Sequence, residues 1–191
     1  WLEARPDPSR FGIPGGKTAI GLLPGSRAGE VATHLPILLA AAREILRKFP
    51  DVHFALPVAG ESLRGPISRQ LQGAGIPATI VEADRQLMFR GLTAAVSVSG
   101  TATLELALLG VPSVIVYRTS WITYRIGRLL AKVDRIGLPN IIAGESFLPE
   151  RIQDDCRPDR IAEAMCAFLG DPARLAGLRE RAKIQGAGAP G

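Results

Sequence analysis

The stretch SVSGTATLELALLGVP, residues 97–112, decides how this chain folds because it joins a buried strand to a helix. The apolar residues that lead into it predict a strand over Ala94–Val98, and the helix expected over Thr101–Leu109 ends at Gly110 and Pro112. Between them lie Ser99, Gly100 and Thr101, whose small side chains leave backbone N–H groups uncovered at the positive end of a helix dipole. Such a turn is suited to binding phosphate.

The same order of strand, turn and helix repeats on both sides of this stretch. Five strands alternating with helices predict an α/β fold, a Rossmann-like parallel sheet with helices on both faces, in which ligands collect at the carboxyl ends of the strands. The strands are expected at 18–23, 53–58, 78–81, 94–98 and 113–117. The helices are expected at 28–48, 61–72, 85–89, 101–109, 121–133, 158–169 and 172–182, with an irregular stretch at 137–149.

The two ends of the chain differ in composition from the middle. Residues 1–17 are rich in Pro and Gly and are predicted to be a linker, or the tail of a missing N-terminal domain, rather than a packed element. Residues 18–185 are expected to form one Rossmann-like domain, and residues 186–191 a disordered tail. Because the chain begins with Trp1 and not Met, we expect a fragment of a longer protein.

Composition narrows the class of protein. The chain has 191 residues, 47% of them hydrophobic and 5% aromatic, which favours one domain with an aliphatic core. No apolar run approaches the roughly 20 residues that span a bilayer, and no charged-then-apolar leader is present, so a cytoplasmic location is expected. The net charge of +5 favours anionic partners but is too dispersed to indicate nucleic acid.

Two strand-to-helix turns carry candidate binding residues, and in a parallel sheet both open on the same edge. Gly25, Ser26 and Arg27 form the first, where Gly25 permits close approach and Arg27 can donate two hydrogen bonds to a phosphate. The second is Ser99-Gly100-Thr101. One turn into its helix lies Glu105, a carboxylate able to accept hydrogen bonds from ribose hydroxyls. Together they predict a nucleoside diphosphate site, although either turn alone is equally well read as tight-turn glycines and ordinary caps.

The helix expected at 121–133 has one apolar face and one face of aromatic and basic residues. The second face suits a membrane surface or an anionic lipid. A solvated basic face with Trp121 against a missing domain or a partner subunit explains the pattern equally well. The candidate lipid-facing residues are Trp121, Arg125, Arg128 and Lys132.

The remaining chemically active residues indicate no further site. His34 and His53 have no Asp or Cys arranged nearby in sequence and are interpreted as structural. Cys156 and Cys166 lack the spacing of a metal site and are interpreted as reduced packing residues. Asp154-Asp155 is not the spaced pair that holds a divalent metal on a sugar nucleotide, so we expect no metal and no cofactor. No dinucleotide-binding Gly-x-Gly-x-x-Gly follows the first strand, and no P-loop Gly-x-x-x-x-Gly-Lys-Ser/Thr is present, so the dehydrogenase and P-loop readings are weak.

Five ordered motifs resemble lipid-A-disaccharide synthase, a family of glycosyltransferases, and the resemblance covers residues 18–169. The motifs are Leu22–Val31, Ser99–Glu105, Val116–Arg118, Leu138–Gly144 and Pro149–Asp155. The resemblance implies the C-terminal, donor-binding half of a GT-B enzyme. That family transfers 2,3-diacylglucosamine from UDP to 2,3-diacylglucosamine 1-phosphate (lipid X), forms the β-1,6-linked lipid A disaccharide precursor and releases UDP.

The resemblance also assigns roles to residues. It implies that Ser26 and Arg27 contact the diphosphate, that the backbone at Ser99, Gly100 and Thr101 stabilises the departing UDP without a metal, and that Glu105 holds the ribose. The resemblance also implies that the loop from Glu82 to Gln86 borders uracil and that Asn140 faces the cleft. It implies that Glu150 and Gln153 either touch the ligand or brace their loop. The catalytic base is unknown and is expected in the N-terminal domain.

Two residues depart from the family pattern: Ala83 stands where Gly is common, and Thr93 stands where Asp is common. The resemblance implies peripheral association with the cytoplasmic face of the inner membrane; a homo-oligomer is left open. It also implies that the isolated chain binds nucleotide weakly and catalyses nothing. The alternatives are another UDP-N-acetylglucosamine-type GT-B transferase or epimerase, and a non-catalytic nucleotide-binding or interaction domain.

Overall fold

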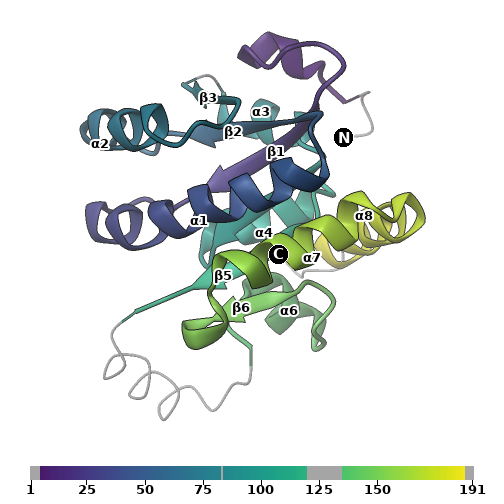
Figure 1. The fold of residues 1–191 in the computed structure, drawn as a ribbon. Coiled ribbons are helices and arrows are strands. Elements are labelled where there is room, and N and C mark those ends of the chain that lie inside the picture. Colours follow the sequence, from purple (N-terminus) through teal and green to yellow (C-terminus); the bar gives the residue numbers. More distant parts are fainter. Residues whose placement is uncertain (1–4, 83, 120–134, 188–191) are drawn as a thin grey trace.

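A single parallel sheet forms the centre of the computed structural model, which describes residues 5–82, 84–119 and 135–187, with side chains as far as residue 181 (Figure 1). Its order is β3-β2-β1-β4-β5-β6, and every neighbouring pair is parallel. The strands are β1 Thr18–Leu23, β2 Val52–Pro57, β3 Ala78–Val81, β4 Ala94–Val98, β5 Ser113–Tyr117 and β6 Glu150–Ile152. The predicted Rossmann-like α/β class is confirmed.

Helices cover both faces of the sheet, as expected for strands that are buried on two sides. The first face carries α1 (Ala28–Lys48), α2 (Glu61–Gln72) and α7 (Pro158–Leu169), and the second carries η1 (Pro8–Phe11), α3 (Arg85–Gly91) and α4 (Thr101–Leu108). Two more helices, α6 (Leu138–Ala143) and α8 (Pro172–Ala187), pack against α4. In Figure 1, α1 lies in front of the sheet.

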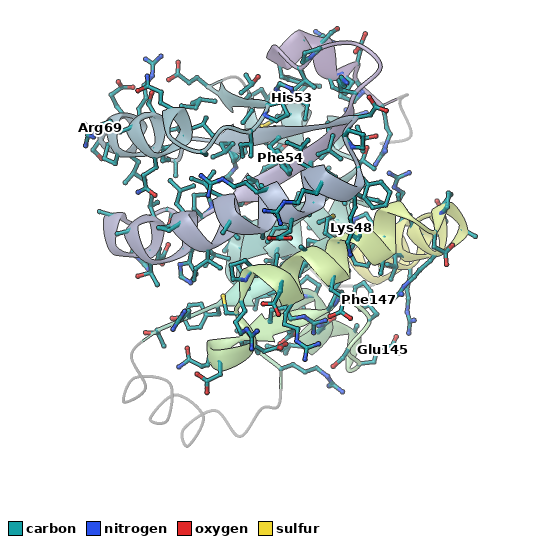
Figure 2. The ribbon with its side chains drawn as sticks, in the orientation of Figure 1. Lys48, His53, Phe54, Arg69, Glu145 and Phe147 are labelled. Carbon is teal, nitrogen blue, oxygen red and sulfur yellow. The ribbon has the colours of Figure 1, made fainter. Side chains whose placement is uncertain are left out.

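Alternate strand residues supply the cores on the two faces. In β1, Ile20 and Leu22 join the larger cluster under α1 and α7, whereas Ala19 and Leu23 join the cluster under α3 and α4. Phe54 of β2 is fully buried on the α1 side (Figure 2). This period of two is the geometry of a strand between two apolar layers.

Three expectations about irregular segments are corrected. Residues 1–17 are not wholly unpacked, because η1 places Phe11 on the core beside α3, with Ile13 following it. The stretch 137–149 contains α6, where Pro139 occupies the first turn that tolerates proline, and it leads into β6, a three-residue edge strand. At the C-terminus, α8 continues to Ala187, so residues 186 and 187 are helical.

The strand order brings the two predicted turns together. The chain moves outward from β1 to β2 and β3, then returns to place β4 on the other side of β1, with Leu22 opposite Val96 and Leu23 opposite Ser97. The turns after β1 and β4 therefore lie side by side at the point where the strand order reverses. Ligands of open α/β sheets bind at this point.

Candidate functional site

The turn after β1 is organised by Glu30 at the start of α1. One carboxylate oxygen, Oε2, accepts hydrogen bonds from the backbone N–H groups of Ser26 at 2.9 Å and Arg27 at 3.3 Å. Gly25 makes room for this carboxylate: its φ is +110°, and a Cβ there would lie 2.6 Å from both Cβ and Oε2 of Glu30. Partial burial opposes the ionised form of Glu30, but the two backbone donors and the Arg27 guanidinium outweigh it and lower its pKa below the ordinary value.

Arg27 extends from this turn into solvent. Its Nη1 donates to Glu30 Oε1 at 3.1 Å, and 83% of its side chain is exposed. A guanidinium has five N–H donors, so one bond to Glu30 leaves most of the fork for a phosphate. Glu30 already accepts from the backbone donors of Ser26 and Arg27, so what this turn offers an anion is the Arg27 side chain and the exposed Ser26 side chain.

The turn after β4 does offer unpaired backbone donors. Within the described residues, the N–H groups of Gly100, Thr101 and Ala102 have no acceptor, and a Cβ at Gly100 would meet nothing within 4 Å. Thr103 donates to the Gly100 carbonyl through both its backbone N–H, at 3.1 Å, and its hydroxyl, at 2.6 Å, which fixes the start of α4. The N-terminal end of α4 therefore presents an open, positively polarised group of N–H donors.

One expectation for this turn is wrong. The N–H of Ser99 donates to the Val116 carbonyl at 2.9 Å, and its hydroxyl donates to the Ile136 carbonyl at 2.8 Å. Ser99 therefore ties the turn to β5 and to the segment before α6, because the sheet continues one residue beyond β4. The donors available to an anion are shifted by one residue, to 100–102.

Glu105 lies one turn into α4 and is held from α3. Arg85 Nη2 contacts Glu105 Oε1 at 2.8 Å, whereas Glu105 Oε2 is buried and has no hydrogen-bond partner within the described part of the chain. An unpartnered buried carboxylate oxygen is unusual in a folded protein and makes Glu105 Oε2 a candidate acceptor for a ligand. The sequence indicated Glu105 and placed Arg85 only within the loop 82–86 expected to border uracil; it gave no sign of the contact between the two residues, which lie on different helices.

The loop expected beside a base forms the start of α3. Asp84 caps this helix by accepting from the backbone N–H groups of Gln86 at 2.9 Å and Leu87 at 3.2 Å. Glu82 forms an ion pair with Arg64 of α2 at 2.8 Å. The side chain of Gln86 is exposed, and Ala83 lies outside the described residues. Arg85 reaches Glu105 from this loop, so the loop lies beside α4, and its contact with a base stays a prediction.

The expectation that Asn140 faces the cleft is wrong, because its side chain is fully buried. Its Nδ2 donates to the Leu148 carbonyl at 2.8 Å and to Glu150 Oε1 at 2.7 Å, and its Oδ1 accepts from the Leu148 N–H at 3.0 Å. Glu150 also accepts from the N–H groups of Ile136 and Gly137. Asn140 and Glu150 therefore brace the segment that Ser99 contacts.

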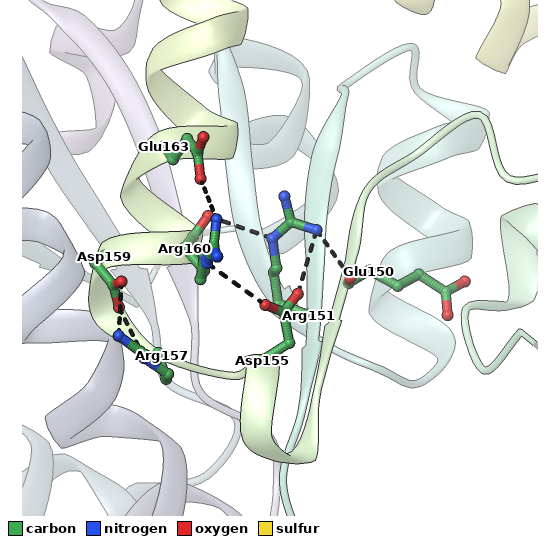
Figure 3. A network of polar contacts seen from close by, with 7 residues as sticks. All are labelled: Glu150, Arg151, Asp155, Arg157, Asp159, Arg160 and Glu163. Carbon is green, nitrogen blue, oxygen red and sulfur yellow. Dashed lines mark hydrogen bonds and ion pairs between the residues drawn. The ribbon is translucent and has the colours of Figure 1, made fainter.

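Glu150 joins this brace to a second polar network at the start of α7 (Figure 3). Its carboxylate points away from the arginines in that view, while its carbonyl accepts from Arg151 Nη1 at 3.3 Å. Arg151 and Arg160 both contact Asp155, at 3.4 and 3.9 Å. These ion pairs are exposed, so their main effect is to orient β6 and α7.

Gln153 and His34 hold the end of β5. Gln153, whose φ is +52°, accepts from the Thr119 N–H at 2.9 Å and donates to the Thr119 carbonyl at 3.2 Å. His34 accepts from the Arg118 N–H through Nε2 at 3.0 Å and, in the tautomer this requires, donates from Nδ1 to the Glu30 carbonyl at 2.8 Å. Burial, followed by the charge of Arg118, lowers the pKa of His34. Its structural interpretation agrees with these contacts.

The remaining predictions concern metals and membranes. Within the described ranges, no group of three or more His, Cys, Asp or Glu side chains could hold a metal ion. No helix among those residues has the length and apolar character needed to cross a bilayer. The predicted lipid-facing residues Trp121, Arg125, Arg128 and Lys132 lie outside the described residues, as does the predicted helix at 121–133.

Solved structures with a similar fold include several glycosyltransferases. Spinosyn rhamnosyltransferase SpnG complexed with thymidine diphosphate aligns with a TM-score of 0.66 at 15% identity, over 98% of this chain and 46% of that one. The catalytic domain of cholesterol-alpha-glucosyltransferase from Helicobacter pylori aligns with a TM-score of 0.63 at 12% identity, over 90% of this chain and 99% of that one. At such low identity these likenesses show the fold alone.

Sequence relatives are much closer. Lipid-A-disaccharide synthase of Geobacter sulfurreducens is 43% identical over 163 residues, which is 85% of this chain and 42% of the relative. The same enzyme of Syntrophus aciditrophicus is 42% identical over 171 residues, 89% of this chain and 45% of the relative. The chain thus spans less than half the length of these relatives. Since the family model described as lipid-A-disaccharide synthetase also matches residues 8–183, the chain belongs to the lipid-A-disaccharide synthase family.

Proposed function

We propose that this chain binds the sugar nucleotide in a glycosyltransferase of lipid A biosynthesis. In this proposal the complete protein transfers 2,3-diacylglucosamine from UDP to 2,3-diacylglucosamine 1-phosphate and releases UDP. The observation that carries the proposal is the pairing, at the reversal point of the sheet, of unpaired N–H groups at 100–102 with the unpartnered Oε2 of Glu105. Donors for a diphosphate and an acceptor for a ribose lie on the same helix, one turn apart.

Each part of this site has a separate task in the proposed reaction. The N–H groups at the start of α4 and the Arg27 guanidinium stabilise the negative charge that grows on the diphosphate as the sugar leaves. Glu105 accepts a hydrogen bond from the ribose and so fixes the nucleotide along α4. The backbone donors are held in place before the ligand arrives, because Thr103 and Ser99 fix both sides of the turn.

Calorimetric titration with UDP tests the assignment. Removal of the charge-assisted hydrogen bonds in Arg27→Ala or Glu105→Ala is expected to weaken UDP binding by about tenfold or more. Arg47→Ala is the matched control, because Arg47 lies on the same helix as Glu30 and pairs with Glu44 at 2.7 Å, far from the turn. If UDP does not bind, or if both site variants bind it like the unaltered chain, the donor-site assignment fails.

This chain spans less than half the length of its relatives, so the proposal for the chain itself covers nucleotide binding alone. We propose that the 191 residues bind UDP without catalysing transfer, because the acceptor site and the base lie elsewhere in the complete protein. Disaccharide synthesis by the isolated chain would contradict this. Peripheral membrane association through residues 121–132 also stays a prediction, tested by flotation of the complete protein with anionic and with neutral vesicles; equal flotation with both would contradict it.

A further inference from the structure

The two oxygens of the Glu105 carboxylate have different environments. Oε1 contacts Arg85 Nη2 at 2.8 Å, whereas Oε2 is buried without a partner. The Arg85 guanidinium is itself positioned by a neighbour on its own helix, since its Cζ lies 5.8 Å from the centre of the Phe89 ring. Phe89 is fully buried in the core beside α3. The Arg85 guanidinium therefore packs over the buried Phe89 ring and contacts the Glu105 carboxylate.

This arrangement acts on orientation more than on stability. The Arg85 side chain is 52% exposed, and ion pairs of this kind contribute little to the free energy of folding. Their geometric effect is greater, because a guanidinium that contacts one carboxylate oxygen restricts rotation of the whole group. Without Arg85, the Glu105 side chain is free to turn toward solvent and satisfy both of its oxygens there. With Arg85, Oε2 stays in its buried, unpartnered position on α4 and can accept one more hydrogen bond.

We propose that Arg85 is a positioning residue that gives the site its selectivity for a ribose diol. It holds Oε1 of Glu105 so that Oε2 accepts a hydroxyl of the ribose in a nucleoside diphosphate. The inference rests on the proposed function, because it assumes that UDP occupies this edge of the sheet. In this proposal α3, which begins at the loop predicted to border the base, also sets how much the ribose hydroxyls contribute to nucleotide affinity.

The test compares UDP with 2′,3′-dideoxyuridine diphosphate, which lacks both ribose hydroxyls, by titration of the protein at its full encoded length. The ratio of the two Kd values measures what the hydroxyls contribute. In the unaltered protein we expect the dideoxy nucleotide to bind about tenfold more weakly than UDP, the effect of one hydrogen bond to a charged group. In Arg85→Gln we expect the ratio to fall below about threefold, with the Kd for the dideoxy nucleotide unchanged. Arg85→Lys should restore part of the ratio.

The control is Arg64→Gln, which removes a comparable ion pair, with Glu82 at 2.8 Å, from the same edge of the sheet. It should leave the ratio at its original value. An unchanged ratio in Arg85→Gln overturns the inference, as does an equal loss of affinity for both nucleotides, which would mean that Arg85 contacts the base or phosphates. Tighter UDP binding in that variant also overturns it, because Arg85 would then compete with the ribose. Failure of the unaltered protein to bind UDP refutes the proposed function itself.

Discussion

Substitution of Gly25 by Ala is expected to dismantle the turn after β1. A φ of +110° is available to glycine and costs other residues about 1–3 kcal/mol. The added Cβ would also lie 2.6 Å from the Glu30 Cβ, so the carboxylate must leave the N–H groups of Ser26 and Arg27. Loss of such a cap costs about 0.5–2 kcal/mol. The lower chain entropy of unfolded alanine returns about 0.4–1 kcal/mol.

The midpoints of these three ranges sum to a net loss of about 2.5 kcal/mol before any clash is counted. For a chain of this size that corresponds to a fall of roughly 5–10 °C in Tm, measured by circular dichroism at neutral pH. UDP affinity should fall with it, because Arg27 loses its support.

Gly29→Ala is the matched control for this substitution. Gly29 belongs to the first turn of the same helix, and a Cβ there would meet nothing within 4 Å. Alanine is the better helix former by about 1 kcal/mol, so Tm should stay the same or rise slightly. A Gly25→Ala chain whose Tm lies within about 2 °C of the unaltered value would refute the capping argument.

Two further predictions concern buried polar groups. Burial lowers the pKa of His34 and of His53 in the folded chain, so the unfolded chain takes up more protons as pH falls below about 6.5, and folding stability should decline there. Thermal melts between pH 7.5 and pH 5.5 should show a fall that is smaller in His34→Gln; an identical pH dependence would exclude His34 as a contributor. Asn140→Leu leaves both backbone groups of Leu148 unpaired and should lower the free energy of unfolding by about 2–4 kcal/mol in urea titrations, whereas the exposed Ile142→Ala changes it little. Unaltered stability together with loss of UDP binding would contradict this structural role and would support a role for Asn140 in ligand binding.

Local patterns in the sequence determined most of the elements of this fold. Five of the six strands follow from short apolar runs, and the helix starts at 28 and 101 follow from the turns before them. The exceptions have local causes. The short edge strand β6 carries charged residues, and α6 contains a proline and ends at a glycine with φ of +68°, so both resemble loop sequence.

The candidate site was predictable where its residues act within one turn. Gly25, Arg27, Gly100, Thr101 and Glu105 could be found because a glycine-containing strand-to-helix joint has the same geometry wherever it occurs. Asn140 could not be placed, since a polar side chain in a motif gives no sign of whether it binds a ligand or other parts of the chain.

Only the tertiary structure decided which of these turns are neighbours and which side chains join them. The placement of β4 beside β1 sets the two turns together, and it depends on how the whole sheet is ordered. Contacts such as Arg85 with Glu105, 20 residues apart, and His34 with Arg118, 84 residues apart, depend on that order. Periodicity reports which face of an element is apolar, but the partner across a sheet edge is set by packing between elements distant in the sequence.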